Sequence, residues 1–334
     1  IQKLLYYVKK LSIMLNLKSD RLPFTSLHYL EHLKNYYNGE CLYYYNLFIN
    51  NNKPILEDIL IHIGKLDHTF SIFLLIKKIK LYNYPVCYSN IIKKESSENH
   101  LKMMDFWNIQ LFQKNPVFNS LELGKKYRKN IILTGPNAGG KTTLIKAIFY
   151  NLVLSHLYGF SCSENYISNE YTYLFSHINK IDKIDKYSLF QSEVRHFNEI
   201  INNIELFPNY FGVMDELFTS TTPEEGASCA YSLANYIGSQ KGIIIVTTHF
   251  KILSILEYNN PHFFNISMGY KNNQFNYKAE PGDNHVHIAL ELLNTHKYTK
   301  LFYNSSKNIL DYILSLKLDY NKDFKYSYKN LKND

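Results

Sequence analysis

Apolar positions in residues 1–100 recur at steps of three and four, the spacing that places side chains on one face of a helix. The clearest stripe runs along one long helix and consists of Ile55, Leu56, Ile59, Leu60, Ile63, Leu66, Phe70, Phe73 and Leu74. A polar and charged stretch, residues 93–100, comes after it and is typical of a linker. The pattern therefore predicts a mostly helical segment over residues 1–100 that is separate from the rest of the chain.

Beyond residue 100, short apolar runs alternate with amphipathic stretches. Strands are predicted at residues 130–135, 210–216 and 242–249, and helices at residues 142–157, 192–204 and 224–237. Strands separated by helices imply an α/β fold with a mostly parallel sheet, in which ligands bind beyond the carboxyl ends of the strands.

Composition and charge narrow the class of protein only a little. The hydrophobic content of 46% suffices for a normal core, and the longest uninterrupted apolar runs, residues 71–76 and 242–246, are too short to span a bilayer. Residues 1–16 lack the features of a signal peptide, and the four cysteines form no CxxC pair. We therefore expect a soluble, intracellular protein of the cytoplasm, nucleoid or nucleus, without a membrane partner. The net charge of +8 favours contact with a polyanion such as DNA, although a solvated surface carries such a charge equally well.

A glycine-rich segment between a predicted strand and a predicted helix carries the clearest chemical signal. Residues 135–142 read GPNAGGKT, which fits the pattern GxxxxGK[ST]. Backbone N–H groups of such a loop cradle phosphate oxygens, and the helix N-terminus adds its positive dipole. We expect Lys141 to contact the β- and γ-phosphates of ATP and the Thr142 hydroxyl to ligate Mg²⁺. The candidate nucleotide-binding residues of this segment are Gly135, Pro136, Asn137, Ala138, Gly139, Gly140, Lys141, Thr142 and Thr143.

Two other strand ends carry side chains that could complete an ATPase site. Asp215 is placed to hold the water shell of Mg²⁺, and Glu216 to polarise the attacking water. His249 could hydrogen-bond the γ-phosphate, although a histidine at a strand end is commonly structural. The predicted catalytic residues are Lys141, Glu216 and His249, and the predicted metal ligands are Thr142 and Asp215. Ser188, at a helix start, is by itself typical of an N-cap.

Together these segments resemble the MutS family of DNA mismatch repair proteins. LTGPNAGGKTT at residues 133–143 resembles the family's TGPNMGGKST, and SLFQSEV at residues 188–194 resembles STFMVEM. DELFTSTTPEEGASCAYSLA, from residue 215, resembles DEIGRGTSTYDGLALAWA, and VTTHF, from residue 246, is similar to ATHY. YKAEPGDNHVHIALEL, from residue 277, resembles YKLxxG followed by SYGIxVAKLAG. The helix IGKLDHTFSIFLLIKK, from residue 63, is similar to the family's LD-containing helix, which leads from the levers into the ATPase domain.

The resemblance implies an organisation and a set of site residues. It implies an ABC-type P-loop ATPase domain at residues 101–295, a lever-like helical segment at 1–100 and a C-terminal helical dimerisation element at 296–334. Two chains, as a homodimer or a heterodimer, would pair head to tail around two nucleotides. Ser188 would reach the γ-phosphate of the partner's ATP, Asn137 would link nucleotide to dimer contact, and Phe118 or Val117 would lie against adenine.

The chain also departs from the family. Ala138 replaces the usual Met, and Thr142 replaces Ser but keeps the hydroxyl. After Glu216 the family's GRGTS reads FTSTT, and this loop carries signals between subunits, so we expect altered coupling. With 334 residues the chain leaves no room for the mismatch-reading N-terminal domain, so mismatch recognition does not carry over.

Three functions fit these observations. The favoured one is a dimeric DNA-repair or recombination protein that binds and hydrolyses ATP with Mg²⁺. The second is an assembly subunit that binds nucleotide, hydrolyses it weakly and partners a fuller MutS-like protein; the altered loop favours it, and the unchanged Lys141, Thr142, Asp215 and Glu216 count against it. The third is another ABC-type ATPase, such as a transporter subunit or a long-coiled-coil DNA ATPase, which the absence of an LSGGQ-like signature and of extended heptads disfavours.

Overall fold

The structure, a computed structural model, describes residues 38–93, 99–124, 128–178, 189–271, 274–284 and 306–309. The chain divides into two compact units, Ile1–Lys78 and Ile79–Asp334. The sequence pattern suggested a boundary at residue 100, and the family resemblance implied a further one at residue 295. Strands β1 (Cys87–Tyr88) and β2 (Asn90–Ile92) pair with strands that lie beyond residue 100. A polar stretch between two apolar regions can therefore lie between strands of one unit as well as between domains.

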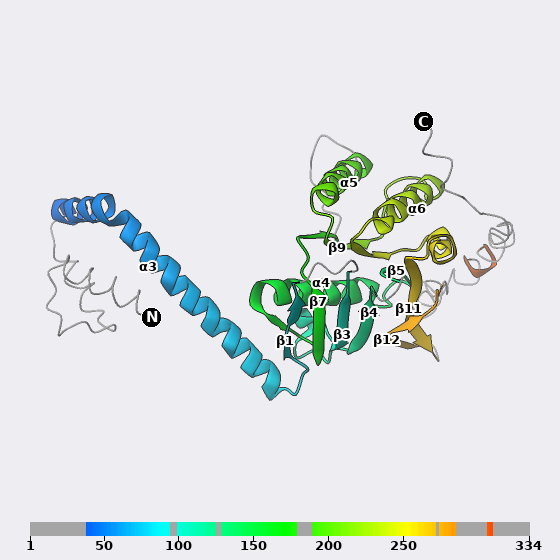
Figure 1. Ribbon diagram of the computed structural model, residues 1–334, viewed down its shortest axis with the longest axis horizontal. Coiled ribbons are helices and arrows are strands. Elements are labelled where there is room, and N and C mark those ends of the chain that lie inside the picture. Colours follow the sequence, from blue (N-terminus) through cyan, green and yellow to red (C-terminus); the bar gives the residue numbers. More distant parts are fainter. Residues whose placement is uncertain are drawn as a thin grey trace. The chain divides into compact units, whose positions relative to one another are not determined.

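A long helix, α3 (Asn38–Leu81), accounts for the described part of the first unit and is drawn in blue in Figure 1. It confirms the helix predicted from the apolar stripe, and Ile59 of that stripe is buried. Most of the stripe is 45–60% exposed: Leu60, Ile63, Leu66, Phe70, Phe73 and Leu74. The helical spacing thus identified the helix correctly, but burial of the stripe is not seen.

The same helix is the one candidate membrane span among the described residues. Its stretch Glu57–Leu81 is long and apolar enough to cross a bilayer by length and composition, a test that core helices of soluble proteins also pass. The apolar runs considered in the sequence, residues 71–76 and 242–246, are too short to span a bilayer. The helix passes the test because the few polar residues that break such runs lower its average hydropathy only slightly.

A six-stranded sheet forms the centre of the second unit, in the order β12-β11-β5-β10-β9-β8. The strands are β5 (Asn130–Thr134), β8 (Tyr173–His177), β9 (Tyr210–Asp215), β10 (Ile243–Thr247), β11 (Phe263–Lys271) and β12 (Gln274–Pro281). Neighbours from β11 to β8 pair in parallel, and β12 adds an antiparallel edge. The α/β fold with a mostly parallel sheet is therefore confirmed, as are the three predicted strands.

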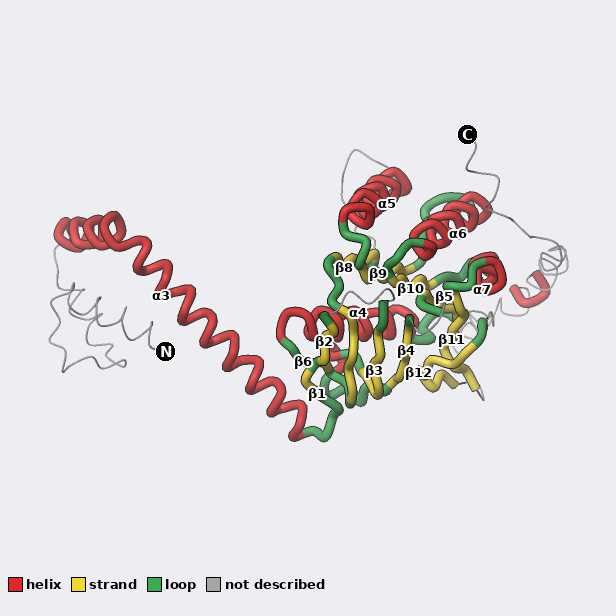
Figure 2. Tube along the Cα trace, in the orientation of Figure 1, coloured by secondary structure: helices red, strands yellow, loops and turns green. Residues whose placement is uncertain are grey.

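Helices cover both faces of this sheet, as Figures 1 and 2 show. One face packs on α4 (Lys141–Tyr158), and the other on α5 (Leu189–Leu206) and α6 (Pro223–Ser239). Successive side chains of a strand point to opposite faces, so Ile131 of β5 packs with α4 while Ile132 packs with α5 and α6. A strand covered on both sides is buried throughout, which explains the continuous apolar runs in the sequence.

A second, four-stranded sheet lies on the far side of α4, in the order β2-β7-β3-β4. It contains β3 (Leu101–Phe106), β4 (Asn119–Leu123) and β7 (Asn165–Asn169), and β6 (Phe160–Ser161) pairs with β1. The described part of the unit also contains short helical turns: η1 (Ile109–Leu111), η2 (Lys251–Ile255) and α7 (Leu256–Asn259). Residues 306–309 are helical, and the rest of the expected C-terminal element at 296–334 lies outside the described residues.

A buried asparagine at the start of β5 ties the sheet to α6. The Asn130 side chain donates to the Gly238 carbonyl at 2.7 Å and accepts the Ile244 N–H at 2.9 Å. Asn130→Ala would leave both backbone groups buried without this partner, so we expect the free energy of unfolding to fall by about 1–3 kcal/mol. Urea denaturation followed by circular dichroism measures it. Asn202→Ala, on the exposed side of α5, is the control and should change stability by less than about 0.5 kcal/mol; equal effects of the two variants would contradict the prediction.

Candidate functional site

Three of the predicted site segments meet at the carboxyl ends of neighbouring parallel strands. Asp215 on β9 pairs in register with Thr247 on β10, and Thr247 pairs with Leu133 on β5. The glycine-rich loop, the acidic pair and His249 each follow one of these strand ends. The edge at which parallel strands end is where α/β folds bind ligands.

The glycine-rich loop requires unusual backbone angles. Gly135 and Gly140 have φ values of 138° and 95°, which favour glycine, and Gly140 is the N-cap of α4. A Cβ on Gly140 would lie 3.1 Å from Cδ1 of Tyr277, so the close approach of that ring also favours glycine. Ala138 adopts a positive φ of 63°. The resulting loop ends at the N-terminus of an eighteen-residue helix, a position suited to an anion.

Lys141 is buried within this loop. Its Nζ donates to the carbonyls of Gly135 at 2.9 Å and Pro136 at 3.2 Å, and lies 3.2 Å from Nε2 of His249. Burial lowers the pKa of Lys141, and the carboxylates of Glu216 and Asp215 act in the opposite direction. Phosphate oxygens could replace the two carbonyls as acceptors and would favour the charged ammonium.

The acidic pair contacts both the loop and His249. The Thr142 hydroxyl donates to Oδ2 of Asp215 at 2.8 Å, and Nε2 of His249 lies 2.7 Å from Oε1 of Glu216. A hydroxyl and a carboxylate are oxygen donors of the kind Mg²⁺ prefers, and this ion usually keeps waters and substrate phosphates as further ligands. Thr142 and Asp215 therefore fit Mg²⁺, while Glu216 and His249 form a separate pair beside them.

A cavity of about 400 Å³ opens beside the loop, a size typical of small-molecule sites. Glu216 reaches one side of it, and Val117, Met268 and Tyr277 supply apolar and aromatic surface elsewhere. The predicted nucleotide-binding residues that line it are Pro136, Asn137, Ala138, Gly140, Lys141, Thr142 and Thr143. The cavity thus combines a cationic, N–H-rich end with an apolar remainder.

The two residues that the family resemblance added to the phosphate loop, Phe118 and Ser188, are not seen to line this cavity. Phe118 is not among the described residues that line it; its ring lies 6.1 Å from that of Tyr84, while its neighbour Val117 does line the cavity. Ser188 lies outside the described residues, which resume at Leu189.

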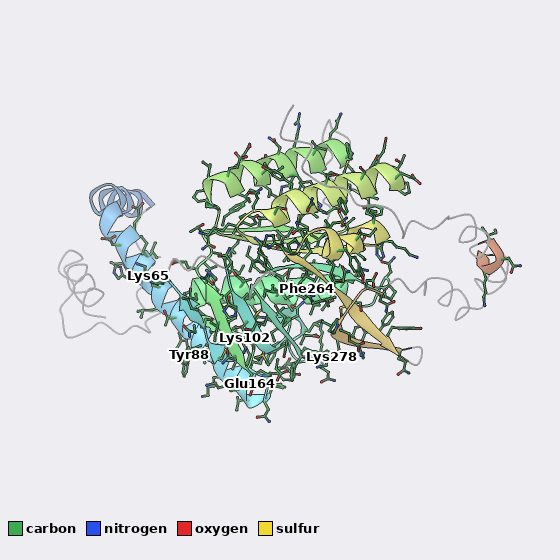
Figure 3. The ribbon with its side chains drawn as sticks, turned by 45° about the vertical axis from the view of Figure 1, so that its right-hand side comes forward. Lys65, Tyr88, Lys102, Glu164, Phe264 and Lys278 are labelled. Atoms are coloured by element: carbon green, nitrogen blue, oxygen red, sulfur yellow. The ribbon has the colours of Figure 1, made fainter. Side chains whose placement is uncertain are left out.

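Tyr277 is a cavity residue that the sequence motifs did not single out. It has a φ of 54°, and its ring stacks on Phe275 with centroids 5.9 Å apart. The hairpin of β11 and β12, which contains a bulge between Met268 and Tyr270, brings it to the loop. Lys278, labelled in Figure 3, is the next residue on β12 and donates to the Phe118 carbonyl. The one signal in the sequence was that residue 277 begins a segment resembling the MutS family.

In the loop after Glu216, the residues that stand in place of the family's two glycines make contacts with α5. Phe218 stands where the family has its first glycine and keeps a positive φ of 51°, and its ring packs on Phe190 and Phe197 of α5. Ser220 donates to the buried carboxylate of Glu193 at 2.5 Å. Burial of the phenylalanine ring offsets the backbone strain, and the loop is fastened to α5, the helix that follows Ser188 in the chain.

Comparison with known proteins places these features in a family. A family model described as MutS domain V matches residues 131–300, half of the chain. Endonuclease MutS2 of Ligilactobacillus salivarius is 30% identical over 181 residues, 53% of this chain and 22% of that protein. Endonuclease MutS2 of Leuconostoc mesenteroides is 31% identical over 175 residues, 52% and 22% of the two chains. The protein of that name from Enterococcus faecalis is 27% identical over 212 residues, 62% of this chain and 25% of that protein.

The chain therefore spans a quarter or less of the length of these relatives. The matched region contains the glycine-rich loop, the acidic pair and His249, together with the sheet that carries them. Because the family model covers half of the chain and includes this site, the chain belongs to the MutS family.

Proposed function

We propose that the second unit is an ABC-type P-loop ATPase that binds ATP with Mg²⁺ and hydrolyses it. The observation that carries the proposal is the meeting of Lys141, Thr142, Asp215, Glu216 and His249 around the loop end of one cavity. Each has side-chain chemistry that phosphoryl transfer to water requires. They come from three separate places in the chain: the start of α4, the end of β9 and the segment after β10.

Binding would use the loop and the apolar part of the cavity. Lys141 would exchange the carbonyls of Gly135 and Pro136 for phosphate oxygens, at the N-terminus of α4. Val117 rather than Phe118 is positioned to contact the base, because Val117 lines the cavity. The ring of Tyr277 offers a second surface in the same cavity.

Hydrolysis would depend on Glu216. Thr142 and Asp215 would hold Mg²⁺, which when bound would neutralise charge on the phosphates. The Glu216 carboxylate would orient the attacking water and accept its proton, while His249 at 2.7 Å fixes that carboxylate. Nε2 of His249 cannot donate to Glu216 and accept from Lys141 at the same time. A bound phosphate that attracts Lys141 would therefore leave Nε2–H free to donate to Glu216.

Membership of the MutS family supports a proposal for the wider role. We propose a dimeric, MutS-type switch that acts on DNA in repair or recombination, in which ATP holds two chains together and hydrolysis releases them. The net charge of +8 supports contact with a polyanion, and work on DNA places the protein inside the cell, in the cytoplasm, nucleoid or nucleus. Mismatch reading is outside the proposal, because the chain matches a quarter or less of its relatives' length.

One observation favours a second candidate, a subunit that binds nucleotide but hydrolyses it weakly. The loop after Glu216 holds a buried Phe218 and a Ser220 tied to Glu193 where the family has glycines. A loop held in this way could slow the conformational change by which the family's loop carries signals between the ATP sites of two subunits. The unchanged Lys141, Asp215 and Glu216 favour the active ATPase.

Equilibrium binding and steady-state hydrolysis of ATP with Mg²⁺ test the proposal, with Lys141→Met alongside. Loss of the ammonium removes charge-assisted contacts, so we expect ATP to bind about 10- to 150-fold more weakly. Lys146→Met, on the same helix, is the matched control and should bind like the wild type. Equal affinity of all three proteins would overturn the proposal, and tight binding without turnover would favour the second candidate.

A further inference from the structure

Thr247, the last residue of β10, joins the two acidic residues of the site. It is completely buried, and the parallel register of β9 and β10 places it beside Asp215. Its hydroxyl donates to Oδ1 of Asp215 and accepts the backbone N–H of Glu216 at 3.2 Å. Its own carbonyl accepts the same N–H at 3.1 Å. One hydroxyl therefore touches both residues on which the proposed chemistry depends.

The hydrogen bond from Thr247 fixes the orientation of the Asp215 carboxylate. Oδ2 receives the hydroxyl of Thr142 at 2.8 Å, and Oδ1 receives the hydroxyl of Thr247. A carboxylate held at both oxygens cannot rotate about its terminal bond. Thr247 thus directs Oδ2 of Asp215 towards Thr142. Asp215 and Thr142 together would hold Mg²⁺.

The contact to Glu216 supports an uncommon backbone conformation. Glu216 has a φ of 52°, in the left-handed region that non-glycine residues rarely adopt. Its N–H is shared between two oxygens of Thr247, which hold the chain in this turn. The turn brings the Glu216 carboxylate to His249 and to the cavity. Strained backbone at such a position persists where the surroundings enforce it.

We propose that Thr247 is a positioning residue of the ATPase site, which aligns the metal-holding Asp215 and the water-orienting Glu216 through a single hydroxyl. The inference rests on the proposed function. In this proposal Thr247 does not contact the nucleotide. Loss of its hydroxyl should therefore affect the chemical step and the response to Mg²⁺ more than the binding of ATP.

An isosteric substitution isolates the hydroxyl. Thr247→Val keeps the volume, the strand and the carbonyl contact to Glu216, and removes only the two hydroxyl contacts. We expect kcat for ATP hydrolysis to fall about 10- to 100-fold, the size of effect that a small misplacement of catalytic groups produces. KM for ATP should change less than about threefold, and the Mg²⁺ concentration for half-maximal rate should rise. Thr247→Ser restores the hydroxyl and should recover most of kcat.

Thr248→Val is the matched control, because that neighbouring hydroxyl accepts the Phe250 N–H instead. It should keep kcat near the wild-type value. Wild-type kcat in Thr247→Val would overturn the inference, as would equal losses in Thr247→Val and Thr247→Ser that follow a lower melting temperature. No turnover by the wild-type chain would instead overturn the proposed hydrolysis, and with it the inference.

Discussion

Replacing Glu216 by Gln is expected to lower kcat for ATP hydrolysis by about 10²–10⁴-fold, the range that general-base catalysis typically contributes. Glutamine has nearly the same shape, and its carbonyl can still accept a hydrogen bond from His249, which lies 2.7 Å from the carboxylate. It cannot accept the proton of the attacking water. The loop, Lys141 and Thr142 remain unchanged, so ATP should bind with nearly wild-type affinity. Single-turnover hydrolysis and equilibrium binding of ATP measure the two effects separately.

Glu224→Gln provides the control for this change. Glu224 is exposed in the first turn of α6, and removing its charge alters the net charge of the protein by the same amount. Its hydrolysis rate should match the wild type. A Glu216→Gln protein that keeps more than about a tenth of the wild-type rate would mean that another group orients the water. Equal, very slow rates in wild type and variant would identify the nucleotide-binding assembly subunit instead.

Replacing Trp107 by Ala is expected to lower the free energy of unfolding by about 3–5 kcal/mol, the cost usual for truncating a large buried aromatic. Trp107 is fully buried, its ring lies edge-on to Tyr84 at 5.1 Å, and its Nε1 donates to the Pro85 carbonyl at 2.8 Å. The Asn151 side chain donates to its carbonyl at 3.0 Å. Truncation leaves a cavity and removes this hydrogen-bond donor from the half-buried Pro85 carbonyl. Urea denaturation measures the loss, followed by far-ultraviolet circular dichroism because Trp107 is the single tryptophan of the chain.

Tyr258→Ala is the control for loss of an aromatic ring without loss of burial. Tyr258 is 84% exposed in α7, so its truncation should change stability by less than about 0.5 kcal/mol. A loss below about 1 kcal/mol in Trp107→Ala would contradict the packing described for this side chain. The result is independent of the proposed ATPase activity, since it depends only on the fold of the second unit.

Local sequence patterns were enough to locate the loop, the acidic pair and the main strands and helices. The glycines of residues 135–142 and the strand and helix on either side are contiguous in sequence, and their backbone requirements can be read from neighbouring residues. Asp215 ends an otherwise apolar strand and Glu216 follows it, in the structure as in the sequence prediction. Buried parallel strands are easy to find because both of their faces are apolar.

The strands that were not predicted differ in that respect from the ones that were. β3, β4, β7 and β8 include exposed or half-exposed positions, so they lack a continuous apolar run. The hairpin of β11 and β12 depends on a register that includes a bulge. Such strands are stabilised by pairing with distant segments, and that pairing leaves a weak trace in the local sequence.

The alignment of the site itself depends on contacts between residues far apart in the chain. Residue type and spacing singled out Lys141, Thr142, Asp215, Glu216 and His249 as candidates, because the expected chemistry follows from motifs a few residues long. The contacts of Thr247 with Asp215 and Glu216, and the position of Tyr277 beside the loop, appeared only once the strands were paired. The structure also showed that Val117 lines the cavity, whereas Phe118 is not among its lining residues. Register determines which side chain of a strand faces the cavity and which hydroxyl meets which carboxylate, and a one-residue shift would reverse both. Motifs therefore specify which groups the site contains, and the folded sheet specifies how they are held.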